Sequence, residues 1–372
     1  RDTDRSRGLG DVYKRQELDK AFKQDGHLEL KTYTLSVPLL GEEEEAVRMQ
    51  QDILTTYPTP PLAVIIVGDP AWLVCTPLFD KQWKDIPIIL CYSRSRIPSS
   101  LRVLLDKSPL TKENSLSIDE LNKKYNITVL ENPSYLEGTV DLMRKLQPQM
   151  QKLAFISDNR YISVYTCTEL IELMERRFPD MKLEILTEQE LDVKQLLDKL
   201  DSYGPEVGIL FYSWIKSEQE YENYYWANHF NRCLSAVAHS PIYTVDDLNA
   251  ENGTFVGGCY ISVQDFAKSC MAVIERVLSG EQASSIPRST GGVPRAYLSY
   301  PELQRFRVTP SLYPSDAFYY NRPKTFFEKN QWLIYMCILF LCLLILLKSW
   351  YDWRNGKGKH LNRQIINALN FP

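Results

Sequence analysis

Residues 62–70 read LAVIIVGDP, an unbroken apolar run that ends in a glycine, an aspartate and a proline. An apolar run of this length, without alternation, is typical of a strand buried on both faces of a parallel sheet. Gly68 and Asp69 predict a tight turn, and Pro70 suits the first turn of a helix that follows. The stretch therefore predicts a strand–turn–helix unit, the building block of an α/β fold.

The same order of strand and helix recurs along the chain. It begins again at residues 152–159, KLAFISDN, after a first series of such units. A strand is also predicted before residues 62–70, at residues 28–37. The strands predicted after residues 62–70 are residues 86–92, 125–130, 152–157, 182–186, 206–212, 241–245 and 253–261, with helices between most of them. We therefore predict two Rossmann-like lobes. Lobe 1 takes residues 17–150 together with about 287–308, whose strand and short helix are expected to return to it, and lobe 2 takes residues 151–286.

Polar and aromatic side chains stand where several of these strands end. Ligands of open parallel sheets collect at the carboxyl ends of the strands, so facing lobes would line a cleft with these residues. The candidate ligand-binding residues are Asp69, Tyr92, Asp158, Asn159, Tyr212, Trp214 and Tyr243. They suit a small polar organic solute through hydrogen bonds and stacking. Turn formation and helix capping account for Asp69, Asp158 and Asn159 equally well.

Charge and motif content exclude several other functions. The 372 residues hold 43 basic and 47 acidic side chains, for a net charge of -4, which argues against a nucleic-acid partner. The sequence has no P-loop, no GxGxxG and no G-x-S-x-G elbow. No Cys and His residues stand at zinc spacing. We therefore predict no enzyme activity, cofactor or metal in this stretch of chain.

Residues 332–347, WLIYMCILFLCLLILL, contain no charge, glycine or proline. With their flanks they approach the roughly 20 residues that cross a bilayer, so residues 331–351 are predicted to be a transmembrane helix. Trp332, Trp350, Tyr351 and Trp353 stand at its ends, as in interfacial aromatic belts. A buried core helix is the alternative, but the segment lacks an amphipathic pattern.

The charges around this segment predict its orientation. Lys348, Arg354, Lys357, Lys359 and Arg363 follow it against a single acid, Asp352, which places residues 352–372 in the cytoplasm. Residues 309–330 then form a juxtamembrane segment outside, although its own basic residues oppose this orientation. The expected location is the bacterial inner membrane, with the lobes in the periplasm.

We expect an artefact at the N-terminal end of the chain and a truncated domain at its C-terminal end. DVYKRQ (11–16) resembles the in-frame translation of a transposon end used in sequencing libraries, so we expect residues 1–16 to be an adapter artefact. A natural polar arm is the alternative. The chain stops just after an apolar pattern at residues 365–369, which indicates a truncated further domain.

Six cysteines precede the apolar segment, and none forms a CxxC pair. Cys91 ends a predicted apolar strand and Cys259 lies in another, which favours buried free thiols. Oxidation of some of them in an exported domain is the alternative.

Several stretches together resemble the periplasmic sensor domain of bacterial membrane histidine kinases, which is related to type I periplasmic binding proteins of ABC transporters. The resemblance covers nearly all of the chain beyond Gln16. The stretches that carry it are PPLAVIIVGDPAW (60–72), WKDIPIILCYS (83–93), KLQPQMQKLAFISDN (145–159), GTFVGGCYISVQDFAKSCMAVIERVLSGEQASSIP (253–287), AYLSYPELQRFRV (296–308) and NRPKTFFEKNQWLI (321–334). After the apolar segment, LNRQIINALNFP (361–372) resembles the start of a PAS domain. Ala267 and Asn159 stand where the family often has glycine.

The resemblance implies a solute-sensing input region of a two-component histidine kinase, in a fragment without the kinase core. A small polar solute, or a ligand-loaded binding protein, would favour closure of the lobes, and a homodimer is expected in the full-length protein. The alternatives are a substrate-binding component of an ABC transporter, or a sensor for another output domain such as a cyclase.

Overall fold

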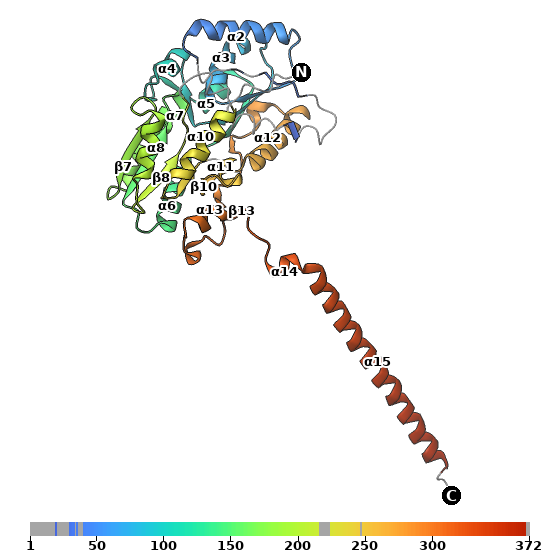
Figure 1. The fold of residues 1–372 in the computed structure, drawn as a ribbon. Coiled ribbons are helices and arrows are strands. Elements are labelled where there is room, and N and C mark those ends of the chain that lie inside the picture. The colour runs from blue at the N-terminus through green and yellow to red at the C-terminus, as the bar shows by residue number, and fades with distance from the viewer. Residues whose placement is uncertain are drawn as a thin grey trace. The chain divides into compact units, whose positions relative to one another are not determined.

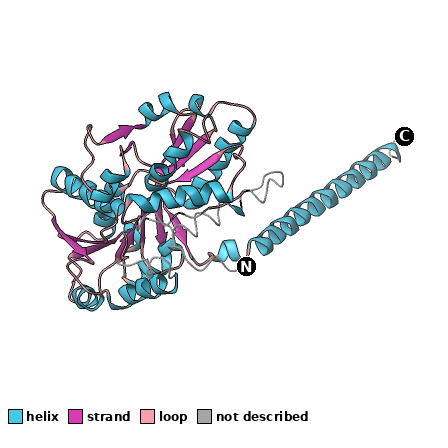
Figure 2. Cartoon of the chain, turned by 90° about the horizontal axis from the view of Figure 1, so that it is seen from above, coloured by secondary structure: helices cyan, strands magenta, loops and turns pink. Residues whose placement is uncertain are grey.

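The structure is a computed structural model that describes residues 19–20, 30–33, 35, 40–215, 224–245 and 248–369. The expected artefact at residues 1–16 lies outside the described residues. The chain divides into two compact units, Arg1–Asn321 and Arg322–Pro372. The first unit contains two α/β lobes, and Figures 1 and 2 show helices packed around their strands.

Lobe 1 is built on a four-stranded parallel sheet in the order β1-β2-β5-β11. Its strands are β1 (Val64–Val67), β2 (Ile88–Ser93), β5 (Ile127–Glu131) and β11 (Ser289–Thr290). Its first helices are α2 (Glu43–Thr56), α3 (Asp69–Phe79), α4 (Leu101–Asp106) and α5 (Ile118–Lys124), and two short strands, β3 (Arg96–Pro98) and β4 (Ser115–Ser117), pair beside them. The apolar runs at 62–67 and 86–92 thus contain strands, as predicted.

Lobe 2 is built on a seven-stranded sheet in the order β13-β12-β10-β9-β8-β6-β7. Its strands are β6 (Lys152–Ser157), β7 (Lys182–Thr187), β8 (Val207–Phe211), β9 (Ile242–Thr244), β10 (Gly257–Tyr260), β12 (Arg295–Ser299) and β13 (Phe318–Tyr320). Its helices are α6 (Leu136–Leu146), α7 (Tyr161–Arg177), α8 (Val193–Asp201), α10 (Tyr224–Val237), α11 (Leu248–Glu251) and α13 (Tyr300–Arg305). Two 3₁₀ turns complete the first unit: Ala283–Ser285 packs beside β5 of lobe 1, and Pro310–Leu312 packs against lobe 2.

Two helices pack on the lobe opposite to the one predicted. α6, expected in lobe 1, buries Val140 and Met143 in one apolar cluster with Phe155 of lobe 2. Helix α12 (Val263–Leu278), expected in lobe 2, buries Phe266 and Cys270 against the sheet of lobe 1. The chain therefore crosses between the lobes after β5, after β10 and once more between β11 and β12. The apolar face of a helix was predicted correctly, but its periodicity carries no information on which sheet covers it.

The expected return of residues 287–308 to lobe 1 is wrong for most of that segment. Ser289 and Thr290 do extend the lobe 1 sheet beside β5. β12 instead pairs antiparallel with β10, with Gly257 opposite Leu298, so it belongs to lobe 2. Glycine in β10 permits this pairing, because a Cβ atom at Gly257 would lie 2.0 Å from the carbonyl oxygen of Tyr297 in β12.

The second unit consists of α14 (Phe326–Lys329) and α15 (Gln331–Leu369). α14 begins with a capping box, in which Thr325 and Glu328 each accept a hydrogen bond from the other's backbone amide. Within α15, Gln331–Asn355 is long and apolar enough to cross a membrane, and an 18-residue stretch of it has a mean hydropathy of 2.4. The predicted apolar helix is confirmed, whereas its orientation stays a prediction.

Candidate functional site

Asp69 occupies the first position of α3, separated from β1 by Gly68, and its side chain is buried. Gly68 has a φ of 87°, which glycine adopts without strain, so the chain can turn sharply from strand to helix. The Asp69 carboxylate accepts a hydrogen bond from the Ser93 hydroxyl at 2.7 Å. Burial raises the pKa of Asp69 to about 7, although Ser93 and Arg94 favour its ionised form. This carboxyl group therefore titrates near neutral pH.

Arg94 follows β2 in lobe 1, and its side chain reaches helix α7 of lobe 2. Its guanidinium nitrogens lie 2.5 Å from a carboxylate oxygen of Glu169 and 2.8 Å from the hydroxyl of Thr166. The guanidinium carbon lies 4.0 Å from the centre of the Tyr165 ring, a cation–π contact. Burial opposes the charge on Arg94, but Glu169 and neighbouring groups outweigh it and hold its pKa above the ordinary value. A buried cation therefore bridges the two lobes.

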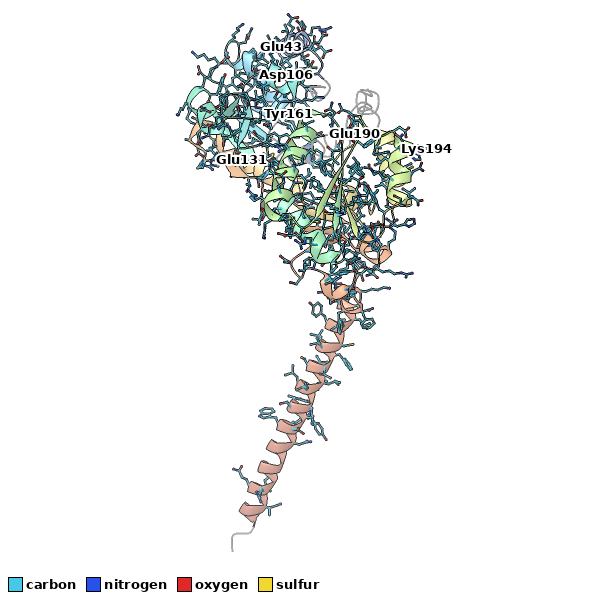
Figure 3. All side chains as sticks on the ribbon, turned by 90° about the vertical axis from the view of Figure 1, so that its left-hand side faces the viewer. Glu43, Asp106, Glu131, Tyr161, Glu190 and Lys194 are labelled. Atoms are coloured by element: carbon cyan, nitrogen blue, oxygen red, sulfur yellow. The ribbon has the colours of Figure 1, made fainter. Side chains whose placement is uncertain are left out.

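Tyr161, Tyr165 and Glu169 share one face of α7 because they are spaced four residues apart. Tyr161 is 6% exposed and packs into the apolar core of lobe 1, although its helix belongs to lobe 2. Figure 3 shows Tyr161 at the junction of the lobes. Its hydroxyl has no hydrogen-bond partner among the residues that the structure describes, and burial raises its pKa. It is therefore a neutral hydroxyl group with an unused donor.

We call the group that joins the lobes here the interlobe cluster; it consists of Asp69, Arg94, Tyr161, Tyr165, Thr166 and Glu169. The negative charge of Asp69 helps to raise the pKa of Arg94, Tyr161 and Tyr165. The charged groups of the cluster therefore affect one another. It combines a fixed cation, two carboxyl groups and two aromatic rings. Such a set can recognise a polar solute by hydrogen bonds, charge and stacking.

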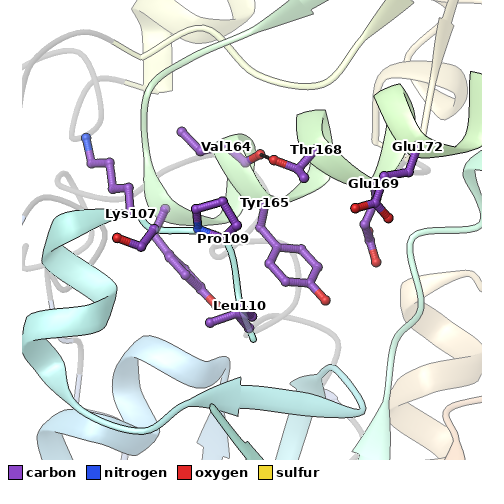
Figure 4. Close-up of a pocket in the computed structure, with 10 residues that line it drawn as sticks. Lys107, Pro109, Leu110, Val164, Tyr165, Thr168, Glu169 and Glu172 are labelled. Atoms are coloured by element: carbon purple, nitrogen blue, oxygen red, sulfur yellow. Dashed lines mark hydrogen bonds between the residues drawn. The ribbon is translucent and has the colours of Figure 1, made fainter. Parts of the chain in front are cut away.

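A cavity of about 140 Å³ adjoins this cluster. Lobe 1 lines it with residues 107–110, which follow α4, and lobe 2 lines it with the α7 face that carries Tyr161, Tyr165 and Glu169. Figure 4 shows the Tyr165 side chain extending from α7 toward Leu110. Because a water molecule takes up about 30 Å³ of liquid, the cavity holds a few waters or a small organic group.

Asp158 lies at the carboxyl end of β6 and organises the facing edge of lobe 2. Its buried carboxylate is 3.0 Å from the guanidinium of Arg160, and it also accepts hydrogen bonds from the Ser163 hydroxyl and the Ile215 backbone amide. Nearby, Glu188 accepts a hydrogen bond from the backbone amide of Asn159 at 2.9 Å. Burial raises the pKa of Glu188, and Asp158 adds to this effect.

The sequence-predicted residues divide into two groups in the structure. Asp69, Asp158 and Asn159 lie at strand ends, as expected, and each takes part in the polar contacts described above. Tyr212 follows β8 and is half-buried, and it is one of the groups that raise the pKa of Arg94. Tyr92 sits at a bulge in β2 with a φ of 56°. Its ring stacks on Phe266 of α12, with ring centres 3.9 Å apart.

The placement of Trp214 and Tyr243 corrects the sequence-based expectation. Tyr243 is fully buried in the core of lobe 2, and Trp214 is 3% exposed and stacks on Phe230. Both serve as packing residues in this structure, because their side chains point into the apolar layers beside the sheet rather than past its edge.

Sequence reasoning missed the residues of α7 that face lobe 1. Tyr161, Tyr165 and Glu169 lie within a helix, whereas ligand contacts were expected at strand ends. The four-residue spacing of two tyrosines and a glutamate was the available signal. Arg94 follows a predicted strand but was not among the predicted contacts.

The comparisons with solved structures identify the fold. A conserved domain protein from Vibrio cholerae aligns with a TM-score of 0.52 at 14% identity, over 80% of this chain and 91% of that one. The ABC domain from Streptococcus pneumonia, in complex with L-Trp, aligns at 0.53 and 14%, over 82% and 94%. The ligand-free, open structure of a substrate binding protein with adhesive properties from Clostridium difficile aligns at 0.51 and 10%, over 83% and 94%.

The first unit therefore has the fold of type I periplasmic binding proteins, as the resemblance implied. No protein-family model matches the chain, and no curated protein matches its sequence. In the described part of the chain, no group of three or more His, Cys, Asp or Glu side chains could hold a metal ion.

Proposed function

We propose that the first unit is a receptor for a small polar solute, which binds between the lobes at the interlobe cluster and its cavity. The observation that carries the proposal is the bridge from Arg94 of lobe 1 to Thr166 and Glu169 of lobe 2. Charged and aromatic groups from both lobes meet beside a cavity, so a bound solute would contact both lobes together. Such a ligand stabilises whichever lobe arrangement it binds more tightly.

The fold supports this proposal without identifying the solute. One structural neighbour was solved with L-Trp and another is described as a substrate binding protein. By analogy, the unit would serve as the substrate-binding component of a transporter or as the input of a receptor. In both cases α15 would hold it at a membrane.

The proposal is tested by equilibrium binding. The full chain in detergent micelles is screened by thermal shift against sugars, amino acids, nucleobases and short peptides, and hits are measured by calorimetry. Tyr165→Ala removes a ring that lines the cavity, and it is expected to weaken binding of a genuine ligand at least tenfold. Tyr351→Ala, outside the first unit, is the control and should bind normally.

A second candidate function is transmembrane signalling to a histidine kinase, and the length of α15 favours it. Its 39 residues correspond to about 58 Å at 1.5 Å per residue, well beyond the roughly 30 Å of a hydrocarbon core. A continuous helix could transmit movement of the lobes to a domain beyond the membrane. The proposal requires a periplasmic first unit and a cytoplasmic end of α15.

Cysteine accessibility tests this topology. Single cysteines placed at Lys112 and at Lys357, in a chain without its native cysteines, are treated in intact cells with a membrane-impermeant thiol reagent. Labelling at position 112 and not at 357 supports the signalling candidate, whereas the reverse pattern rules it out. Solute-dependent autophosphorylation of the protein expressed from its full gene would then separate a kinase input from a transporter component.

A further inference from the structure

Glu169 separates the cavity from the buried cation. Its side chain lines the cavity and pairs with Arg94 at 2.5 Å, whereas Arg94 itself is not among the residues that line the cavity. The two side chains differ in exposure, at 35% for Glu169 and 9% for Arg94. A solute in the cavity would therefore reach the guanidinium once the Glu169 carboxylate gives way.

We infer that the Glu169 carboxylate occupies the position beside Arg94 that a ligand carboxylate would take; we call this position the seat. The solute of this receptor would then be a carboxylate-bearing organic compound that competes with Glu169 for Arg94. This inference rests on the proposed function and specifies the chemical class of its ligand. Glu169 would act as a built-in competitor, so that the affinity for the solute is set partly by the strength of its pair with Arg94.

The chemistry of the seat favours a carboxylate over a neutral polar group. A guanidinium presents a planar fork of N–H donors that matches the two oxygens of a carboxylate. Arg94 is buried, so leaving it unpaired would carry a large penalty, and only an anion replaces Glu169 without that penalty. A neutral hydroxyl or amide would leave Arg94 without a carboxylate in direct contact, since Glu169 is the one that pairs with it in the described structure.

Two neighbouring groups complete the seat. Tyr161 lines the cavity, and its buried hydroxyl has no hydrogen-bond partner in the described part of the chain, so it could donate to a ligand oxygen that comes within reach. The Tyr165 ring lies under the guanidinium and also lines the cavity, which holds the cation in place and offers a flat surface to the ligand. Lys107 adds a second cation to the cavity wall.

Chemical rescue tests the inference with simple probes. Glu169→Ala in the full chain removes the competing carboxylate and joins the cavity to Arg94, and its melting temperature should fall. Acetate or propionate is expected to restore most of this loss, whereas acetamide, propionamide and chloride at equal ionic strength should not. The double variant R94Q/E169A lacks the buried cation and should show no rescue, although Lys107 still lines the cavity.

Matched variants keep the test decisive. Glu172→Ala removes another carboxylate at the same cavity, but one with no ion pair to Arg94 within 4.0 Å in the described structure, and should gain no stabilisation from acetate. If E169A does not fold, Glu169→Gln keeps the shape of the side chain, and carboxylates should raise its melting temperature more than that of the wild type. Equal responses to carboxylate and amide, or rescue that persists without Arg94, would overturn the inference.

The inference and the proposed function can fail separately. If neutral solutes bind the wild type and carboxylates do not rescue E169A, the receptor remains and the ligand class is wrong. If carboxylates rescue E169A but no solute in the screen binds the wild type, the seat exists and the receptor proposal fails.

Discussion

The carboxylate of Asp158 accepts a hydrogen bond from the backbone amide of Ile215 at 3.1 Å, and this contact ties the carboxyl end of β6 to the segment that follows β8. The same carboxylate pairs with Arg160, whose side chain is only 15% exposed. One buried group thus fixes two loops at the edge of lobe 2 that faces lobe 1.

Replacing Asp158 with Ala is expected to lower the free energy of unfolding by about 3–5 kcal/mol, because it removes the buried carboxylate that pairs with Arg160 and accepts hydrogen bonds from Ser163 and the Ile215 amide. Urea denaturation of the full chain measures this. Asp180→Ala is the control, since its pair with Arg144 at 3.5 Å is solvent-exposed and contributes about 0–1 kcal/mol. Equal effects of the two substitutions would contradict the structural role given to Asp158.

Asp69 predicts a pH dependence of stability. Its folded pKa of about 7 exceeds the unfolded value near 3.8, so the buried carboxyl group contributes its full stability only below about pH 4. Between pH 4 and 7 the unfolded chain loses this proton more readily, and the wild type should lose stability relative to Asp69→Asn, by on the order of 4 kcal/mol. Urea midpoints of both proteins across this range measure the difference. A constant difference would show that Asp69 does not titrate there.

Lobe 2 has no space for a side chain at Gly258. A Cβ atom at this position would lie 1.9 Å from the carbonyl oxygen of Thr244, which belongs to the neighbouring strand and cannot move aside cheaply. Gly258→Ala should therefore destabilise the protein by more than about 3 kcal/mol or prevent folding. Gly41→Ala, at a position with open space around it, should change stability by less than about 1 kcal/mol. A soluble G258A protein with an unchanged melting temperature would refute this packing.

Cys91 and Cys270 face each other in lobe 1 with their sulfur atoms 3.6 Å apart, and both are buried. Their mutual hydrogen bond and burial raise the pKa of Cys91 well above the ordinary value, so Cys91 should not react as a thiolate at neutral pH, and burial shields both sulfur atoms from reagents. We expect both to resist a thiol reagent in the folded chain and to react after unfolding without reductant. Cys233, which is half-buried, should react faster. If Cys91 and Cys270 react as fast as Cys233 in the folded chain, they are not buried. If they do not react after unfolding either, they form a disulfide.

Local patterns in the sequence were sufficient to predict most strands and the fold class. The apolar runs at 152–157 and 206–212 form β6 and β8, which are buried on both faces of the sheet. Unbroken apolar runs of this length, bounded by turn residues, are typical of such strands. The assignment of α6, α12 and β12 to lobes failed because amphipathicity shows that a face is covered, not by which sheet.

The site was predicted only in part for a related reason. Asp69 and Asp158 could be found because they end apolar strands. Tyr243 was misplaced because an aromatic residue near a strand end packs into the core as readily as it faces a cleft. Tyr161 and Glu169 come from a helix whose partner lies in the other lobe, and their meeting with Arg94 depends on long-range packing that no local pattern encodes.

The most direct test of solute binding between the lobes is a thermal-shift measurement of the full chain in detergent micelles against the solute panel, repeated with Arg94→Gln. We predict that at least one solute, carrying a carboxylate, raises the melting temperature of the wild type by mass action and fails to do so for R94Q. A solute that stabilises both proteins equally, or a panel that stabilises neither, would contradict binding at this site.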